Sequence, residues 1–276
     1  MRDTIYVLTN RFKDEDGEIA KFIAAIVSKE MQTSVVWSEN DIKDDAKVVC
    51  VIGGDGTMLQ SIKRLNDKNI PIVGFNRGTL GFLTELEDSN VQKGLTEIIR
   101  DEYEIEERII LEGNSANTKE EGQTISYNGF AVNDFVFKAS ECNLVTIKVY
   151  VNNRYMDTYI CDGLIFATPT GSTAYNLSAG GPVLMPETNA IAITPICPHS
   201  VNKRSIIVPD KDEIRIEIGR SKEYATDKIS VSSDGNIELL LETGDSFSIK
   251  KSSKTAKIIR LGESNVINRI LTKLNH

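Results

Sequence analysis

The stretch from residue 47 to residue 65 constrains the fold of this chain more than any other part of its sequence. An apolar run, residues 47–52, passes directly into Gly53-Gly54-Asp55-Gly56-Thr57, and residues 58–65 then have the spacing of a helix. This pattern predicts a buried strand that ends in a glycine turn and opens into a helix. Because glycine has no side chain, the backbone of such a turn can approach a ligand closely.

The same order of elements recurs across the first hundred residues. Residues 4–8 predict a strand, residues 17–29 place apolar side chains on one helical face, and residues 70–75 predict another strand. Alternating strands and helices indicate β/α units around a parallel sheet that is covered on both faces. The N-terminal part of the chain is therefore predicted to be an α/β lobe.

Near residue 105 the pattern changes to strand-like runs separated by turn residues. Asn152 and Asn153 stand between two such runs and tolerate the positive φ angles of a tight hairpin. The chain ends in a predicted strand (258–261) and a predicted helix (264–274). We expect an α/β lobe of residues 1–104 plus 256–276, to which the C-terminal segment returns, and a mostly β domain of residues 105–255. The strand-like runs of that domain are 103–111, 123–127, 130–138, 144–150, 164–167, 190–194, 205–208, 213–218 and 237–241.

Charge and hydropathy exclude two classes of partner. The 276 residues include 40 acidic and 32 basic side chains, a net charge of −8, so the positive surplus that drives nucleic-acid binding is missing as a global feature. No apolar run approaches the ~18 residues that span a bilayer, and the first residues lack the order of a signal peptide. We expect a soluble, cytoplasmic protein that binds neither nucleic acid nor membrane.

Cysteine and histidine contribute little to the predicted chemistry. The four cysteines stand singly, without the C-x-x-C spacing of a zinc site or redox pair, and the chain has only two histidines. We therefore expect no metal site built from protein side chains. Acid and base catalysis must fall mainly to carboxylates.

The glycine turn is the first candidate site. The N-terminus of the following helix supplies free N–H groups and partial positive charge for a phosphate. Asp55 would repel that phosphate unless it takes a proton from a hydroxyl or holds a metal ion, which favours phosphoryl transfer. The alternative is a turn in which Asp55 only caps the helix. The chain has neither a P-loop nor a G-x-G-x-x-G dinucleotide fingerprint.

Two further segments are candidates. Residues 162–182 pass from a predicted buried strand into small and hydroxylic residues and then Tyr175, a composition that suits a polar ligand with a flat ring. A Thr/Ser-rich turn that caps a short helix is the alternative. Asn133-Asp134 interrupts the apolar run 130–138, either as a ligand contact or as a solvent-facing pair at a strand end.

Together these motifs resemble those of the NAD kinase family, in family order and over most of the chain. The resemblance implies a Rossmann-like α/β nucleotide-binding lobe and a mostly β domain that binds NAD and forms oligomers. It also implies transfer of a phosphoryl group to the 2′-hydroxyl of the adenosine ribose of NAD, giving NADP. The motifs are Gly53-Gly54-Asp55-Gly56-Thr57, Asn76-Arg77-Gly78-Thr79-Leu80-Gly81-Phe82-Leu83, Asn133-Asp134, residues 162–182 and Thr194-Pro195-Ile196-Cys197-Pro198-His199-Ser200.

The resemblance also implies roles for individual residues. Asp55 would be the general base, and magnesium or another divalent cation would arrive with ATP or polyphosphate as donor. Asn133 and Asp134 would contact ribose hydroxyls, although many members carry Asn-Glu here, which leaves the hydrogen bonds of the shorter Asp134 open. The other implied contacts are Gly53, Gly54, Gly56, Thr57 and Arg77 for phosphates, Phe82 as a pocket wall, and Asp162, Thr170, Thr173, Ala174 and Tyr175 for the adenine and nicotinamide ends.

Two alternatives remain at this point. Lipid kinases of the diacylglycerol and sphingosine type share a Gly-Gly-Asp-Gly-Thr turn, but residues 168–182 resemble a dinucleotide pocket. A non-catalytic dinucleotide sensor would gain by losing the carboxylate of Asp55 beside phosphates. The donor, a preference for NAD or NADH, feedback by NADP and the choice between homodimer and homotetramer stay open.

Overall fold

The computed structural model describes residues 3–10, 12, 14–77, 81–120, 123–140, 143–220 and 228–262, with the backbone alone at 116–120 and 123–125. The chain divides into two compact units. Unit 1 consists of Met1–Arg108 and Thr255–His276, and unit 2 of Ile109–Lys254. The nucleotide-binding, NAD-binding and oligomerisation roles expected for the two parts stay predictions.

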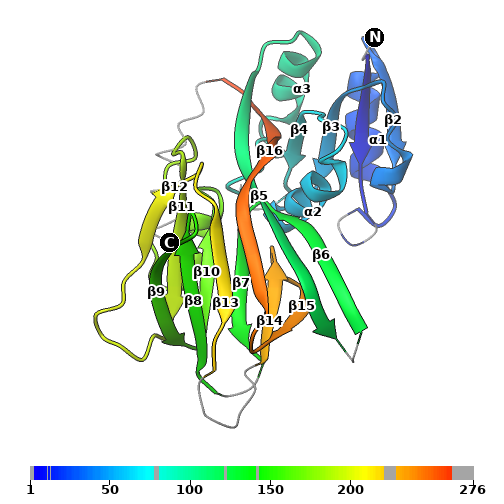
Figure 1. Cartoon of the computed structure of the whole chain (residues 1–276). Helices are drawn as coiled ribbons and strands as arrows, with labels where there is room; N and C mark the ends of the chain where they lie inside the picture. The colour runs from blue at the N-terminus through cyan, green and yellow to red at the C-terminus, as the bar shows by residue number, and fades with distance from the viewer. Residues whose placement is uncertain are drawn as a thin grey trace. The chain divides into compact units, whose positions relative to one another are not determined.

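Unit 1 is built on a parallel sheet with the strand order β2-β1-β3-β4, and the end of β16 adds to β4 in parallel through Ile258 and Ile72. This pairing brings the C-terminal strand back to the N-terminal unit, as predicted (Figure 1). The elements are β1 (Thr4–Leu8), α1 (Glu18–Val27), β2 (Gln32–Val36), η1 (Glu39–Asp41), β3 (Ala46–Ile52), α2 (Asp55–Leu65), β4 (Ile72–Phe75) and α3 (Val91–Ile99).

Both faces of this sheet are covered by helices. Alternate side chains of β3, such as Val48 and Cys50, join a buried cluster with apolar side chains of α1 and α3, including Ile23 and Leu95. Helix α2 packs against β3 and β4, where its Met58 side chain lies over Gly74. The sequence of β3 is therefore almost continuously apolar, because neither face of the strand meets water.

Unit 2 is mostly antiparallel β-structure, arranged in two groups of strands. One group has the order β12-β11-β10-β7-β14-β15; the other includes β16-β13-β8-β9 and the β5–β6 hairpin. The elements are β5 (Glu104–Glu120), β6 (Gln123–Ala131), β7 (Asp134–Ala139), β8 (Val145–Val151), β9 (Arg154–Cys161), β10 (Gly163–Ala167), η2 (Gly171–Thr173), α4 (Tyr175–Ser178), β11 (Ala190–Ile196), β12 (Ile206–Pro209), β13 (Ile214–Ile218), β14 (Lys228–Ser233), β15 (Asn236–Glu242) and β16 (Ser246–Arg260).

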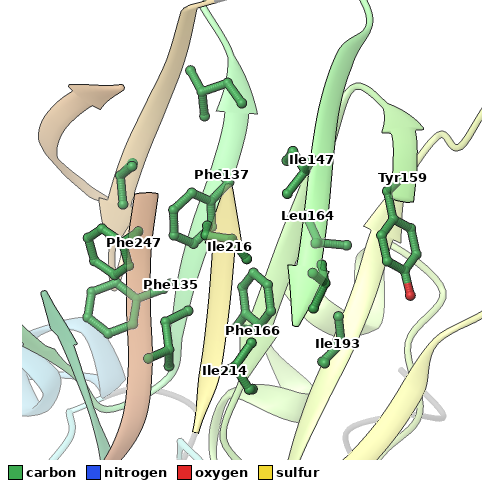
Figure 2. Close-up of a cluster of buried hydrophobic side chains, with 14 of the residues drawn as sticks. Phe135, Phe137, Ile147, Tyr159, Leu164, Phe166, Ile193, Ile214, Ile216 and Phe247 are labelled. Atoms are coloured by element: carbon green, nitrogen blue, oxygen red, sulfur yellow. The ribbon is translucent and has the colours of Figure 1, made fainter. Parts of the chain in front are cut away.

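Aromatic rings fill the core of unit 2. The ring of Phe247 lies between those of Phe135 and Phe137, with centroid distances of 5.6 and 5.2 Å and edge-on geometry. Phe137 meets Phe166 edge-on at 5.5 Å (Figure 2). Gly113 completes the packing, because a Cβ at that position would come within 2.6 Å of both Phe135 and Phe247.

The predicted fold class is confirmed, and several local expectations were wrong. Asn152 and Asn153 adopt φ angles of 50° and 62°, as the hairpin prediction required. The predicted single strand 130–138 is instead two strands, β6 and β7, with Val132 and Asn133 in the turn between them. Strands β2 and β14, helix α3 and residues 246–257 of β16 were not predicted, although α3 buries one helical face and β14 alternates buried and partly exposed side chains. The predicted helix 264–274 lies outside the described residues.

Among the described residues, every helix is too short or too polar to cross a lipid bilayer.

Replacing Phe247 by alanine tests the core of unit 2. We expect Phe247→Ala to lower the free energy of unfolding by about 3–5 kcal/mol, because it removes a fully buried ring from the aromatic cluster and leaves a cavity. Chemical denaturation followed by circular dichroism measures this loss. The control in the same unit is Ile237→Ala, whose side chain is 73% exposed and whose loss should cost no more than about 1 kcal/mol. Equal losses in the two variants would contradict this account of the core.

Candidate functional site

The turn between β3 and α2 is rich in glycine. Gly53 ends the strand, and its N–H donates to the carbonyl of Phe75 at 2.9 Å. Apart from its chain neighbours and the backbone of α2, a Cβ added at Gly54 or Gly56 would meet no atom of the described residues within 4 Å. The first N–H groups of a helix have no partner within the helix, and α2 begins without a side-chain cap. This part of unit 1 fits an anion.

Asp55 is the first residue of α2, and its carboxylate reaches across to a neighbouring turn. Oδ2 accepts a hydrogen bond from the N–H of Phe82 at 2.8 Å, and Oδ1 accepts one from Leu83 at 2.9 Å. Gly81 makes room for this contact, because a Cβ there would lie 1.9 Å from Oδ1. The two bonds occupy about half of the acceptor positions of a carboxylate. Asp55 therefore has a fixed orientation and remaining capacity to accept a proton, and it does not act as a simple helix cap.

The turn that holds Asp55 is itself held by a buried ion cluster in unit 1. Arg260, at the end of β16, donates to the carbonyl of Phe82 at 3.1 Å and to Glu85 Oε2 at 3.0 Å. Its Nε donates to Glu106 Oε2 at 2.5 Å, and Arg108 pairs with the other oxygen of Glu106 at 2.7 Å. Burial raises the pKa of Glu106, but the charges of Arg260 and Arg108 outweigh it and hold that pKa below its ordinary value.

The remaining predicted residues of unit 1 differ in their surroundings. The side chain of Thr57 folds back over Gly53, whose added Cβ would lie 2.5 Å from Thr57 Oγ1. Phe82 is half-buried. Arg77 is exposed, with its Nε 3.9 Å from a carboxylate oxygen of Asp88, so its guanidinium is available to solvent and to an incoming anion. Residues 78–80 of the same motif lie outside the described part of the chain.

In unit 2, the carboxylate of Asp234 accepts hydrogen bonds from the turn that carries Asn133 and Asp134. Asp234 Oδ2 accepts from the N–H of Val132 at 3.0 Å, and its Oδ1 accepts from Asn133 at 2.6 Å and Asp134 at 3.3 Å. The N–H of Asp234 donates to the carbonyl of Asp134 at 3.1 Å. Asp234 and Gly235 both have positive φ angles, 50° and 84°, in the β14–β15 hairpin. The hairpin and the turn therefore form one rigid unit.

Asp134 is a buried carboxyl group, 4% exposed, at the start of β7. Burial, and then the negative charge of Asp234, raise the pKa of Asp134 to about 7. This carboxyl group therefore keeps its proton to a higher pH than an exposed aspartate does. Such a group can donate a hydrogen bond as well as accept one.

The segment after β10 packs against the same turn. The N–H of Thr168 donates to the carbonyl of Asn133 at 2.9 Å, and its hydroxyl donates to the carbonyl of Val132 at 2.6 Å. Gly171 lies so close that an added Cβ would come within 2.1 Å of the Asn133 carbonyl oxygen. These contacts place Asn133, Asp134 and Thr170 close together in unit 2.

Most hydroxyl and amide groups of this segment support its own conformation. Ser172 bonds the carbonyls of Pro169 and Leu184, and the buried amide of Asn176 donates to Ser172 and Pro182. Thr173 and Ala174 are partly exposed, and the ring of Tyr175 is 38% exposed at the start of α4. Tyr175 is thus the ring of this segment that is placed to meet a ligand.

Asp162 lies elsewhere in unit 2. Asp162 comes just before the first residue of β10, and Thr168 comes just after its last. Asp134 pairs with Ala167, at the Thr168 end of the strand. A strand of this length separates its two ends by about 17 Å. The carbonyl of Asp162 accepts from Ala139, at the far end of β7. The structure does not bring Asp162 next to the Asn133 turn within one copy of the unit.

Metal ligands do not gather among the described residues: no group of three or more His, Cys, Asp or Glu side chains could hold an ion. Cys50 and Cys161 are buried and Cys197 is exposed, while Cys142 lies outside the described chain.

Asp234, Asn176 and Arg260 support the candidate site, and none of the three was predicted from the sequence. Asp234-Gly235 is a common hairpin dipeptide and could have been recognised as a turn. Nothing local to Asp234 or Arg260 indicates their partners, because Asp234 and Asn133 are 101 residues apart and Arg260 and Phe82 are 178 apart. The partners of Asn176 are nearer, since its amide binds Ser172 and Pro182 within the same segment.

The chain matches two family models that together cover most of its length. Residues 9–103 match the ATP-NAD kinase N-terminal domain, and residues 133–261 match the ATP-NAD kinase C-terminal domain. The first match contains the glycine turn and Asp55. The second contains the Asn133 turn, the Thr168–Tyr175 segment and Arg260.

Relatives and solved structures agree with these models. An NAD kinase of Lachnospira eligens is 36% identical over 98% of this chain and 99% of its own, and one of Caldanaerobacter subterraneus is 39% identical over 85% and 81%. The yeast NADH kinase complexed with NADH superimposes with a TM-score of 0.82 at 25% identity, covering 99% of this chain and 87% of that one. An Archaeoglobus fulgidus NAD kinase has the same fold, with a TM-score of 0.77 at 22% identity over 99% and 98%. This chain belongs to the NAD kinase family of phosphotransferases.

Proposed function

We propose that this protein transfers the γ-phosphoryl group of ATP to the 2′-hydroxyl of the adenosine ribose of NAD, with Asp55 as general base. The observation that carries the proposal is the carboxylate of Asp55, oriented by the N–H groups of Phe82 and Leu83. Gly54 and Gly56 lie on either side of Asp55, and a Cβ at either would meet none of the described residues beyond its chain neighbours and the backbone of α2. Family membership supports the reaction, because both family models are those of ATP-NAD kinases.

The chemistry follows from the acceptor capacity of this carboxylate. Asp55 takes the proton of the 2′-hydroxyl as the ribose oxygen forms a bond to the γ-phosphorus. The bond from that phosphorus to the bridging oxygen breaks, and ADP leaves with the electron pair. Such a transfer needs positioning and neutralisation more than covalent chemistry, and the first turn of α2 provides N–H groups for phosphate oxygens. Gly53, Gly54, Gly56, Thr57 and the exposed Arg77 are the proposed phosphate contacts.

ATP is the proposed donor, with inorganic polyphosphate as the alternative. A phosphate chain of either kind suits the backbone beside Gly54 and Gly56. Magnesium or another divalent cation would enter on the phosphates and neutralise charge that develops during transfer. The assay that separates the donors measures NADP formed from NAD and the divalent cation with each donor in turn.

Most of the proposed NAD contacts lie in unit 2, and Phe82, in unit 1, stays a predicted contact. Asn133 and Asp134 are assigned to ribose hydroxyls, and the carboxyl group of Asp134 can accept or donate a hydrogen bond near neutral pH. The solved yeast relative holds NADH, which supports dinucleotide binding by this fold. The further proposed contacts are Asp162, Thr170, Thr173, Ala174 and Tyr175.

We also propose a cytoplasmic homodimer or homotetramer, in which unit 2 forms the contact between copies. Size-exclusion chromatography with light scattering measures the mass directly. A monomer at all concentrations would contradict this part of the proposal.

Replacing Asp55 by asparagine tests the general base. We expect Asp55→Asn to bind NAD while kcat falls at least about a hundredfold, because the amide keeps the shape of the carboxylate but cannot take the proton. A coupled assay of NADP formation and a binding titration give the two values. The exposed Asp16→Asn is the matched control and should keep full activity.

The same experiment separates the alternatives. NAD binding without any NADP from either donor, in the wild-type protein, would indicate a sensor. No NAD binding would direct the search to lipid acceptors. Near-normal turnover of Asp55→Asn would remove Asp55 from its proposed role.

Replacing Tyr175 by alanine tests the dinucleotide site. We expect affinity for NAD to fall roughly tenfold, since an exposed ring that stacks on a flat group contributes about 1 kcal/mol or more. Isothermal titration calorimetry measures the change. Tyr175→Phe should keep most of the affinity, and Tyr155→Ala, at a side chain 60% exposed outside this segment, is the control. Unchanged affinity in Tyr175→Ala would place the ring outside the site.

The raised pKa of Asp134 predicts how stability depends on pH. Between pH ~4, where the unfolded carboxyl loses its proton, and pH ~7, where the folded one does, the folded state binds more protons. The contribution of Asp134 to stability therefore falls as pH rises through this window. We expect Asp134→Asn to gain stability relative to wild type from pH 4 to pH 7, measured by denaturation at each pH. Asp16→Asn is the control for removing one carboxylate, and a pH-independent difference would contradict the prediction.

A further inference from the structure

One peptide unit in unit 1 joins Asp55 to a buried cation. The carbonyl oxygen of Phe82 accepts from Arg260 Nη2 at 3.1 Å, and the N–H of Leu83, in the same peptide plane, donates to Asp55 Oδ1 at 2.9 Å. A positive charge at the carbonyl end of a peptide polarises it and strengthens the hydrogen bond at the N–H end. The guanidinium thus acts on the carboxylate through a single planar group.

Arg260 is itself fixed in place. Its side chain is about 5% exposed, and its other nitrogens bind Glu85 Oε2 at 3.0 Å and Glu106 Oε2 at 2.5 Å. Glu85 is held in addition by the N–H of Leu261 at 3.3 Å. Arg260 uses three different nitrogens of its planar guanidinium for these bonds, whereas the three donors of a lysine lie on a single nitrogen and do not reproduce this fork.

We propose that Arg260 is a positioning residue for phosphoryl transfer: through the Phe82–Leu83 peptide it holds the carboxylate of Asp55 in the orientation needed to take the ribose proton. Arg260 touches neither of the reacting groups; it acts through Asp55. The inference rests on the proposed role of Asp55 as general base. It gives a residue at the end of β16 control over the orientation of a carboxylate that follows β3.

A double-mutant cycle between Arg260 and Asp55 tests the proposal. We expect Arg260→Gln to lower kcat about tenfold when Asp55 is present, with KM for NAD within about twofold. In the Asp55→Asn background the same substitution should change kcat by less than about twofold, because the group that it orients no longer takes the proton. Each kcat is calculated from the concentration of enzyme that binds NAD, which a binding titration measures.

Two further variants protect the test from effects on folding. Arg260→Lys keeps a positive charge beside Glu85 and Glu106 and replaces Arg260→Gln if the latter does not fold; it should lower kcat in the same background-dependent way. Glu106→Gln keeps the contact between Arg260 and the Phe82 carbonyl and removes one of the two carboxylates that hold Arg260, so its loss of kcat should be clearly smaller than that of Arg260→Gln.

Three outcomes would overturn the proposal. An equal fold-loss from the Arg260 variants in both backgrounds would show that Arg260 only supports the fold, while the role of Asp55 would stand. A loss in Glu106→Gln as large as that in Arg260→Gln would show a general effect of the buried cluster. Normal turnover of Asp55→Asn by itself would remove the proposed base, and the positioning role would fall with it.

Discussion

Two hydrogen bonds, from the backbone N–H groups of Phe82 and Leu83 to the carboxylate of Asp55, are the constraint on which the candidate site in unit 1 depends. They require Gly81, because any side chain there would occupy the position of the carboxylate. They also require a fixed 82–83 peptide, which the buried guanidinium of Arg260 secures. The parallel sheet and its covering helices serve this arrangement by bringing the start of α2, the turn after β4 and the end of β16 together.

Unit 2 also contains a turn whose backbone N–H groups bind a carboxylate. The carboxylate of Asp234 accepts the N–H groups of the turn that carries Asn133 and Asp134, as Asp55 accepts those of the turn after β4. A carboxylate that binds several backbone N–H groups can order a short turn more rigidly than the backbone alone, because each bond involves a full charge. The charge of Asp234 is unfavourable for a second carboxylate nearby. Asp134 is buried beside that charge, and its pKa is raised.

The sequence predicted those features whose cause is local. Glycines that bracket Asp55, paired asparagines in the β8–β9 hairpin and the change from helical to strand spacing near residue 105 each depend on neighbours within a few residues. The strand 130–138 was wrongly predicted as continuous because its apolar alternation is uninterrupted by glycine or proline, and the break at Asn133 is imposed by Asp234 from another hairpin. Asp162 was grouped with Tyr175 by its place in one motif, although a full strand lies between them.

By itself the sequence determined the class of fold, the glycine turn and the identity of the carboxylate in it, because backbone freedom and apolar periodicity act over short distances. Only the tertiary structure decided which way that carboxylate points, that burial and Asp234 raise the pKa of Asp134, and that Arg260 binds the Phe82 carbonyl. Orientation and pKa depend on burial and on charges brought near from distant parts of the chain, and no pattern within a segment records which partner folding will place beside it.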